Sequence, residues 1–178
     1  MAATDPLQPV ENSLGNALIR HSLLLFVMLS FPLAAVAEQA DSVLVDKSDE
    51  KLYLLKSGSV IAEYSVRFGA NPEGHKAQEG DERTPEGTYV LDYKKSDSAF
   101  YKAIHISYPN EADKKAAAAK GVDPGGAIMI HGQRNRLGWL SFITQRFNWT
   151  DGCIAVTNKE MDEIWNLVPA NTPITIQE

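Results

Sequence analysis

The chain has 178 residues, a formal net charge of −6 at pH 7 and 44% hydrophobic residues. This length suits one domain with a substantial hydrophobic core and is short for two. The negative net charge and the lack of a Lys/Arg cluster argue against a nucleic-acid partner, because a phosphate backbone requires a basic face to neutralise it.

The first predicted element is a leader. Residues 22–36 form an apolar run that follows Arg20 and His21 and leads into Ala35-Val36-Ala37-Glu38, a pattern typical of a secretory signal cleaved after Ala37. An uncleaved anchor and a buried core helix are the alternatives, but 15 residues are few to span a hydrocarbon core about 30 Å thick. We therefore expect residues 1–37 to be a leader, residues 38–178 to be the functional domain, and the protein to be exported to the periplasm or cell envelope.

The functional domain opens with strand patterns. Segments rich in Val, Leu, Ile and Tyr predict strands at residues 42–45, 51–55 and 60–68, with a hairpin turn at Lys56-Ser57-Gly58. In the third segment apolar residues alternate with Glu63, Ser65 and Arg67, which predicts a sheet with one solvated face. Residues 69–87 are rich in glycine and charge, so we expect a long loop that either contacts substrate or is simply solvated.

The second half of the domain mixes strands with two helices. Residues 88–93 and 100–108 read as strands, and residues 111–120 predict a short exposed helix capped by Gly121. A short apolar run precedes His131, and another follows Cys153. Thr157 and Glu160 form a capping box for a helix whose apolar stripe should pack under the sheet: Met161, Ile164, Trp165 and Val168. Residues 172–176 predict a last strand.

Cys153 is the only cysteine of the chain, so it cannot close an internal disulfide. In an exported protein it is a free thiol that is buried and inert, paired to another chain, or catalytic. His131 and Cys153 each stand at the end of a predicted strand beside a glycine, so both could face one cleft. A histidine within reach favours the thiolate, and backbone amides around the cysteine could hold an oxyanion.

Two alternatives use the same residue types differently. A lone cysteine and a lone histidine are often structural, since both are frequently buried. A metal site is less favoured, because zinc needs three or four closely spaced ligands and the remaining histidines of the domain, His75 and His105, are scattered singly. No phosphate loop, dinucleotide fingerprint or other cofactor motif is present.

Together these residues resemble the active-site signature of the L,D-transpeptidase (YkuD-domain) family, which joins a histidine to a Ser/Thr-x-Gly-Cys box. The matching residues are His131-Gly132 and, after an interval, WTDGCIAV at residues 149–156. Residues 80–89, GDERTPEGTY, resemble the family's Thr-Pro-x-Gly segment. The resemblance covers residues 42–176 and implies a mainly β domain of two packed mixed sheets, a YkuD-like β-sandwich, with the C-terminal amphipathic helix and the short exposed helix added to it.

The resemblance also implies roles for individual residues. Cys153 would be the nucleophile, His131 the base, the Gly132 carbonyl the group that orients the imidazole, and Gly152 part of the turn that holds the oxyanion. Contacts to substrate would come from Trp149, Thr150, Asp151, Arg83, Thr84 and Arg134. No cofactor or metal is implied.

The implied substrate is a peptidoglycan stem peptide, cleaved before its terminal D-amino acid and joined to an amine. That amine could belong to a second stem peptide, giving a 3-3 cross-link, or to a lipoprotein lysine, and carbapenem β-lactams are the implied inhibitors. A carboxypeptidase or cross-link hydrolase of the same fold and a non-catalytic peptidoglycan-binding module remain alternatives. Asp151 stands where many members have a second histidine, Ala155 where arginine or asparagine is frequent, and the His-to-Cys interval is long.

Overall fold

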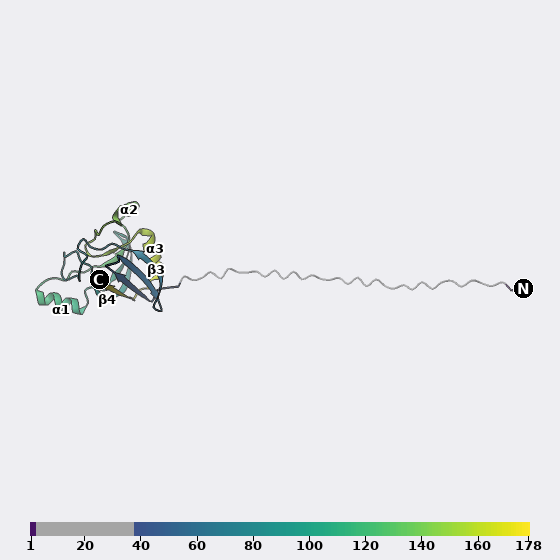
Figure 1. The fold of residues 1–178 in the computed structure, drawn as a ribbon, viewed down its shortest axis with the longest axis horizontal. Coiled ribbons are helices and arrows are strands. Elements are labelled where there is room, and N and C mark those ends of the chain that lie inside the picture. Colours follow the sequence, from purple (N-terminus) through teal and green to yellow (C-terminus); the bar gives the residue numbers. More distant parts are fainter. Residues whose placement is uncertain (3–37) are drawn as a thin grey trace. The chain divides into compact units, whose positions relative to one another are not determined.

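The computed structural model describes residues 1–2 and 38–178, drawn as a ribbon in Figure 1. Residues 3–37, which hold nearly all of the predicted leader, lie outside the described residues, so the leader stays a prediction. Within the described residues, no helix is both long enough and apolar enough to cross a membrane.

Eight strands form one sheet in the order β3-β2-β1-β8-β4-β5-β6-β7. Their bounds are β1 Ser42–Asp46, β2 Lys51–Lys56, β3 Ser59–Ser65, β4 Gly87–Ser98, β5 Tyr101–Ile106, β6 Met129–His131, β7 Ile154–Ala155 and β8 Thr172–Gln177. The helices are α1 Glu111–Lys120, α2 Ser141–Thr144 and α3 Asn158–Leu167, and a short 3-10 turn, η1 Gly138–Leu140, precedes α2.

The fold is mainly β as predicted, but the prediction of two packed sheets is wrong. The last strand, β8, pairs in parallel with β1 and antiparallel with β4, which joins the first three strands and the later ones into one sheet. This sheet curls until its two edges meet. Arg67, just after edge strand β3, exchanges both backbone hydrogen bonds with Ala155 of the opposite edge strand β7, at 2.9 and 2.7 Å. One curled sheet therefore wraps the core that two facing sheets were predicted to enclose.

The core is formed by the inward side chains of this sheet and by one face of α3. The alternation predicted for residues 60–68 is confirmed, because Tyr64, Val66 and Phe68 are buried. From α3, Met161 and Ile164 are fully buried, while Trp165 lies at the edge of the core with the ammonium groups of two lysines over its ring. Truncating a fully buried side chain of this size typically costs about 2–5 kcal/mol.

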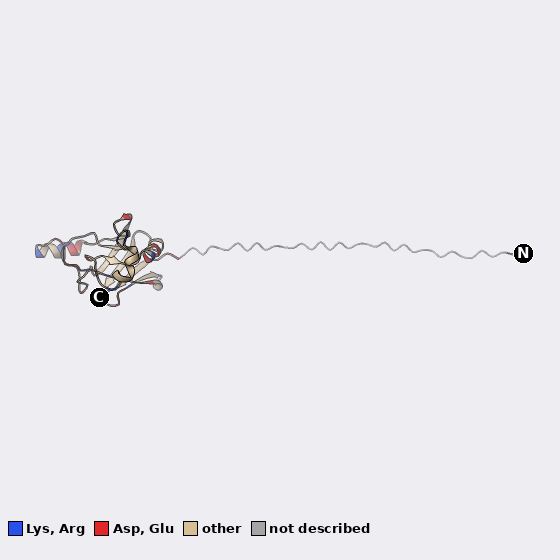
Figure 2. Ribbon diagram, turned by 90° about the horizontal axis from the view of Figure 1, so that it is seen from above, with Lys and Arg blue, Asp and Glu red and all other residues tan. Residues whose placement is uncertain are grey.

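The predicted helix ends are confirmed. In α1 the side chain of Asn110 caps the first turn, and Gly121 ends the helix in the left-handed conformation with φ 69°. Figure 2 shows acidic residues at the first turn of α1 and a basic residue at its last, which suits the helix dipole. In α3 the hydroxyl of Thr157 and the carboxylate of Glu160 form the predicted capping box. Because the cap residue Thr157 follows Cys153 by only four positions, this cap fixes the chain that leaves the cysteine turn.

Candidate active site

His131 and Cys153 are presented by two neighbouring strands, β6 and β7, which pair in parallel. The register sets Ile130 opposite Ile154 and His131 opposite Ala155. Side chains alternate along a strand, and both isoleucines point into the core, so His131 and Cys153 point to the other face of the sheet. Both residues line one cavity of about 590 Å³.

The His131 ring is fixed by one hydrogen bond and two aromatic neighbours. Its Nδ1 lies 2.7 Å from the carbonyl oxygen of Gly132. A carbonyl only accepts, so Nδ1 carries the proton and Nε2 of the neutral ring has a free lone pair. The ring packs against Phe100 and Trp149, with centroids 4.7 and 5.8 Å away. Burial lowers the pKa of His131, against the opposing effect of the Gly132 hydrogen bond, so the imidazole is neutral near pH 7.

The Cys153 thiol is partly exposed and lies next to the β6 backbone, with Sγ donating to the carbonyl oxygen of Ala127 at 3.7 Å. Burial raises the pKa of Cys153, and the nearby carboxylate of Asp151 raises it further. A backbone hydrogen bond from Met129 and the charge of Lys76 act in the opposite direction. The shifts therefore favour a neutral thiol and a neutral imidazole, and both groups line the same cavity.

The turn before Cys153 is stabilised by hydrogen bonds of Thr150, a residue of the same turn. The hydroxyl of Thr150 donates to the carbonyl oxygen of Cys153 at 2.7 Å and accepts the backbone N–H of Gly152 at 3.2 Å. Gly152 has φ 114°, a conformation open mainly to glycine, and a Cβ there would lie 2.4 Å from the carbonyl oxygen of Arg83. The Cys box thus requires glycine at this position for both conformation and space.

The long loop of residues 69–87 packs directly beneath this turn. The buried hydroxyl of Thr84 donates to the carbonyl oxygen of Gly152 at 2.9 Å. At the start of the loop, Gly69 forms an isolated β-bridge with Thr150, and a Cβ on Gly69 would lie 1.9 Å from the carbonyl oxygen of Glu82. The loop is therefore a support for the cysteine turn, and its Thr-Pro segment acts through the Gly152 carbonyl.

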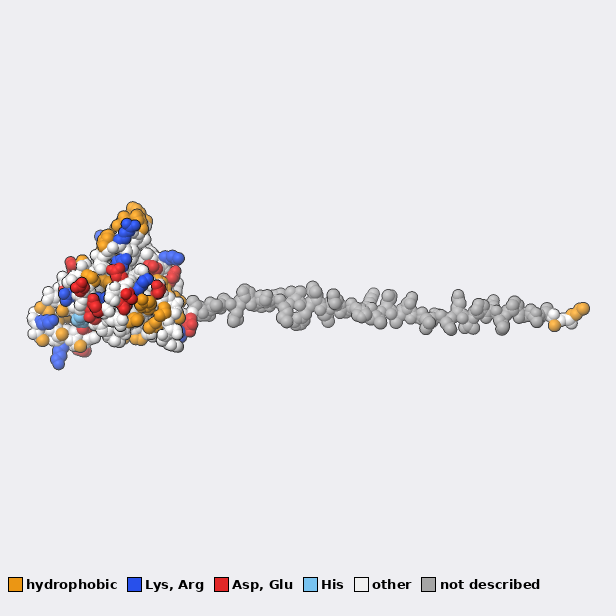
Figure 3. Space-filling model, viewed as in Figure 1, with side chains coloured by type: hydrophobic (Ala, Val, Ile, Leu, Met, Phe, Trp, Pro, Cys, Tyr) orange, Lys and Arg blue, Asp and Glu red, His pale blue; other side chains and the backbone are white. Residues whose placement is uncertain are grey.

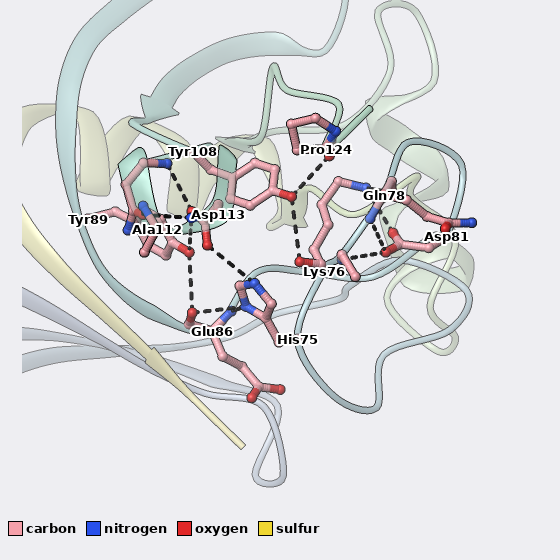
Figure 4. Close-up of polar contacts among 12 residues, drawn as sticks. His75, Lys76, Gln78, Asp81, Glu86, Tyr89, Tyr108, Ala112, Asp113 and Pro124 are labelled. Atoms are coloured by element: carbon pink, nitrogen blue, oxygen red, sulfur yellow. Dashed lines mark hydrogen bonds and ion pairs between the residues drawn. The ribbon is translucent and has the colours of Figure 1, made fainter. Parts of the chain in front are cut away.

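Polar contacts shown in Figure 4 hold the loop in shape. The carboxylate of Asp81 accepts hydrogen bonds from the Lys76 ammonium at 2.8 Å and from the Ala77 amide at 2.7 Å. His75 accepts the Glu86 amide at Nδ1 and directs Nε2 to a carboxylate oxygen of Asp113 in α1, 3.3 Å away. His75 therefore ties the loop to α1, a structural task that its isolated position in the sequence did not reveal.

The structure brings together most of the residues that the sequence singled out. Besides His131 and Cys153, the cavity is lined by Trp149, Thr150, Asp151 and Arg134. Gly132 and Gly152 are buried beside it. Arg83 and Thr84 do not line this cavity, and Thr84 lies behind the cysteine turn instead.

Several cavity residues were missed by the sequence analysis. Phe100 covers the His131 ring, and Met129, Leu137 and Leu140 add apolar wall. Phe100 reaches the site because β5 pairs with β6, setting Ala103 opposite His131. Alternation within residues 100–108 indicates a strand, but it does not say which strand lies beside it.

Among residues 1–2 and 38–178, no group of three His, Cys, Asp or Glu side chains is placed to hold a metal ion. His105 is 2.7 Å from Asp92 and stacks on Tyr93.

Comparison with known proteins shows the family of this chain. The family model of the L,D-transpeptidase catalytic domain, YkuD, matches residues 40–176, so the chain belongs to this family. Over 124 residues the chain is 36% identical to the protein named "Putative L,D-transpeptidase YafK" of Escherichia coli (strain K12), a match that covers 68% of this chain and 40% of YafK.

Solved structures share the fold. Pgp2, the helical cell shape determining protein of Campylobacter jejuni, has a TM-score of 0.60 at 25% identity over 79% of this chain and 48% of its own. Bd1075 of Bdellovibrio bacteriovorus has a TM-score of 0.55 at 24% identity, covering 79% of this chain and 49% of its own. An L,D-transpeptidase of Xylanimonas cellulosilytica has a TM-score of 0.50 at 16% identity, over 79% of this chain and 61% of its own. The chain thus spans about two fifths of YafK and about half of Pgp2.

Proposed function

We propose that this domain is an exported cysteine acyltransferase that forms a thioester between Cys153 and a peptidoglycan stem peptide. The observation that supports it most is the state of His131. Its Nδ1–H donates to the Gly132 carbonyl and burial lowers its pKa, so Nε2 has a free lone pair, and the ring lines the same cavity as Cys153. A histidine oriented in this way is suited to accept a thiol proton.

In the acylation step, a proton moves from the Cys153 thiol to His131 and the thiolate attacks a substrate carbonyl. His131 takes the proton from the Cys153 thiol, and the thiolate attacks the carbonyl carbon of the bond that precedes the terminal D-amino acid. When the tetrahedral intermediate collapses, the C–N bond breaks and the imidazolium returns the proton to the leaving amine. The products are a thioester on Cys153 and a free D-amino acid.

The intermediate needs donors for its oxyanion. The backbone N–H of Gly152 already donates a hydrogen bond to the hydroxyl of Thr150. We assign this task to the amide of Cys153 itself, whose position is set by the hydrogen bond from Thr150 to the Cys153 carbonyl. Fixed backbone donors of this kind stabilise developing charge without reorganising.

In the second half-reaction an amine attacks the thioester and gives its proton to His131, and the C–S bond breaks. An amine from a second stem peptide would give a 3-3 cross-link, and a lipoprotein lysine would give an attached protein. Water in its place would give a carboxypeptidase or hydrolase, because only the second nucleophile differs. A non-catalytic wall-binding module is a weaker candidate, since both His131 and Cys153 are present and share one cavity.

The cavity suits the proposed donor. Its walls are largely apolar, while the exposed guanidinium of Arg134 lies at its edge. A stem peptide carries carboxylates, which a guanidinium binds well. Trp149, Thr150 and Asp151 complete the proposed binding surface. Because Pgp2 is a cell shape determining protein, we include cell-shape maintenance in the proposal.

The test is incubation with a disaccharide-tetrapeptide, followed by separation of the products. We expect a cross-linked dimer and a free D-amino acid from the wild type, and neither from a folded Cys153→Ala variant. A tripeptide without dimer would assign hydrolysis instead of transfer. Unchanged tetrapeptide with every amine acceptor supplied would contradict the proposed enzyme.

A further inference from the structure

Exposed apolar side chains gather on one segment beside the cavity, residues 134–147, here called the α2 segment. Eight large apolar side chains of the described domain are exposed, and five of them belong to this segment. They are Leu137, Trp139, Phe142, Ile143 and Phe147, with exposed fractions of 40, 70, 60, 42 and 53%. A contiguous apolar surface of this kind marks an interaction site in a soluble domain more often than chance exposure does.

The α2 segment has two faces with different surroundings. Leu137, Leu140 and Thr144 line the cavity. Trp139, Phe142 and Phe147 do not line it, although they are among the most exposed apolar side chains of the domain. Contact with a substrate in the cavity therefore does not account for the outer face.

The charge of the segment differs in sign from that of the chain. Arg134, Arg136 and Arg146 are exposed, and none of the ion pairs among the described residues includes them. No acidic residue occurs between Asp123 and Asp151, whereas the whole chain has a net charge of −6. Figure 3 shows hydrophobic and basic side chains together on the projection where Figure 1 places α2. The arginines are too dispersed to form a basic run in the sequence, and the fold groups them with the aromatic residues.

We propose that the outer face of the α2 segment docks on a bilayer surface that contains anionic phospholipid. Tryptophan and phenylalanine favour the boundary between headgroups and acyl chains, and arginines around them attract anionic headgroups. The acidic remainder of the domain would be repelled by the same surface, so the charge pattern also orients the molecule. A domain docked in this way holds its cavity at the membrane surface. This inference does not depend on the chemistry proposed for Cys153.

The test measures quenching of tryptophan fluorescence by brominated phosphatidylglycerol, using the full chain and lipid vesicles. The three tryptophans are Trp139, Trp149 and Trp165, and the apolar run at residues 22–36 has none, so insertion of that run alone gives no signal. Trp139 is 70% exposed, whereas the other two are half-buried. We expect strong quenching in the wild type and loss of most of it in Trp139→Phe.

Matched variants separate the apolar from the electrostatic contribution. Vesicle partitioning is measured through the quenching of Trp139. Phe142→Ser combined with Phe147→Ser should weaken it about tenfold or more, because two aromatic side chains no longer enter the interface. Val60→Ser combined with Val90→Ser changes two exposed apolar residues elsewhere, on β3 and β4, and should change partitioning less than about twofold. Replacing Arg136 and Arg146 with glutamine should remove most of the preference for phosphatidylglycerol over phosphatidylcholine, as should high salt. Arg134 is kept in this variant because it lines the cavity.

Three results would overturn the proposal. The first is no quenching of Trp139 in anionic vesicles. The second is a dimer without lipid that the Phe142→Ser, Phe147→Ser variant dissociates, with no quenching in the wild type. The third is binding to isolated peptidoglycan that the same variant loses, again without quenching. The last two would assign the surface to a second copy of the chain or to the cell wall.

Discussion

The hydroxyl of Thr84 donates a hydrogen bond to the carbonyl oxygen of Gly152, 2.9 Å away, and both groups are buried. This bond joins two segments 68 residues apart, the Thr-Pro segment of the long loop and the turn that presents Cys153. The position of the thiol therefore depends on a loop that contributes neither His131 nor Cys153.

Replacing Thr84 with valine keeps the shape of the side chain but leaves the Gly152 carbonyl without its donor. We expect the free energy of unfolding to fall by about 1–3 kcal/mol, the usual cost of a buried polar group left unsatisfied. The rate of Cys153 acylation should fall as well, because the turn is no longer held. Thr88→Val, at an exposed position of β4, is the control for denaturant unfolding. Equal stability of the two variants would show that the bond does not support the turn.

Gly152→Ala tests the close approach at the turn. The added Cβ would lie 2.4 Å from the Arg83 carbonyl oxygen, at φ 114°, so backbone atoms must move. The matched control is Gly80→Ala, where φ is 76° and nothing lies within 4 Å of the added Cβ. The control should cost about 1–2 kcal/mol from conformation alone. Thermal unfolding should show a clearly larger loss for Gly152→Ala, and equal losses would mean that the Arg83 segment yields easily.

The pH dependence of acylation should report the neutral His131. Burial lowers its pKa below the ordinary 6.5, so the base stays unprotonated as pH falls from 8 to 6.5. The acylation rate should stay level over this range and decline only at lower pH. Because the unfolded state takes up a proton more readily, His131 also makes the fold less stable as pH falls below 6.5. A rate that already declines between pH 8 and 7 would contradict a neutral histidine base.

Asp81 should matter for the loop that supports the turn. Burial opposes its ionisation, but hydrogen bonds from Lys76 and from the amides of Ala77, Gln78 and Arg83 outweigh burial and lower the pKa of Asp81 to about 2. Against an unfolded value of 3.8, this contributes about 2 kcal/mol of stability above pH 4, which is lost as pH falls through about 2. Asp81→Asn should remove that stability at pH 7, while Asp97→Asn, at an exposed position, should not. Urea unfolding of both variants at pH 7 and pH 2.5 measures the free energy of unfolding. If Asp81→Asn lost the same free energy at the two pH values, the stabilisation would not come from the ionised carboxylate.

Local patterns predicted much of the fold. The hairpin turn at Ser57-Gly58, helix α1 with its glycine cap and the capping box of α3 depend on neighbours in the sequence, and all three are confirmed. The single sheet was not predicted, because it depends on β8 entering between β1 and β4. Strand β4 extends to Ser98, five residues beyond the predicted end, since pairing with β5 holds a polar sequence in the extended form.

In the candidate site, too, the local features could be predicted from the sequence and the contacts between distant segments could not. The Gly-flanked His131 and Cys153 could be singled out from the sequence, and the strand register then explains why they share a cavity. The cover that Phe100 gives to His131 comes from strand pairing, and the support that Thr84 gives to Gly152 comes from a contact across 68 residues. Neither follows from a local pattern. Residues 134–147, which belong to the long His-to-Cys interval, contain η1 and α2 and carry the outward aromatic residues.

The central claim is that Cys153 is an acylated nucleophile with His131 as its base. Its most direct test is intact-protein mass spectrometry of the folded, reduced protein after incubation with a carbapenem. We expect a mass increase of one carbapenem in the wild type, none in Cys153→Ala, and a much slower increase in His131→Ala. No mass increase in the wild type, or the same increase in Cys153→Ala, would contradict the account.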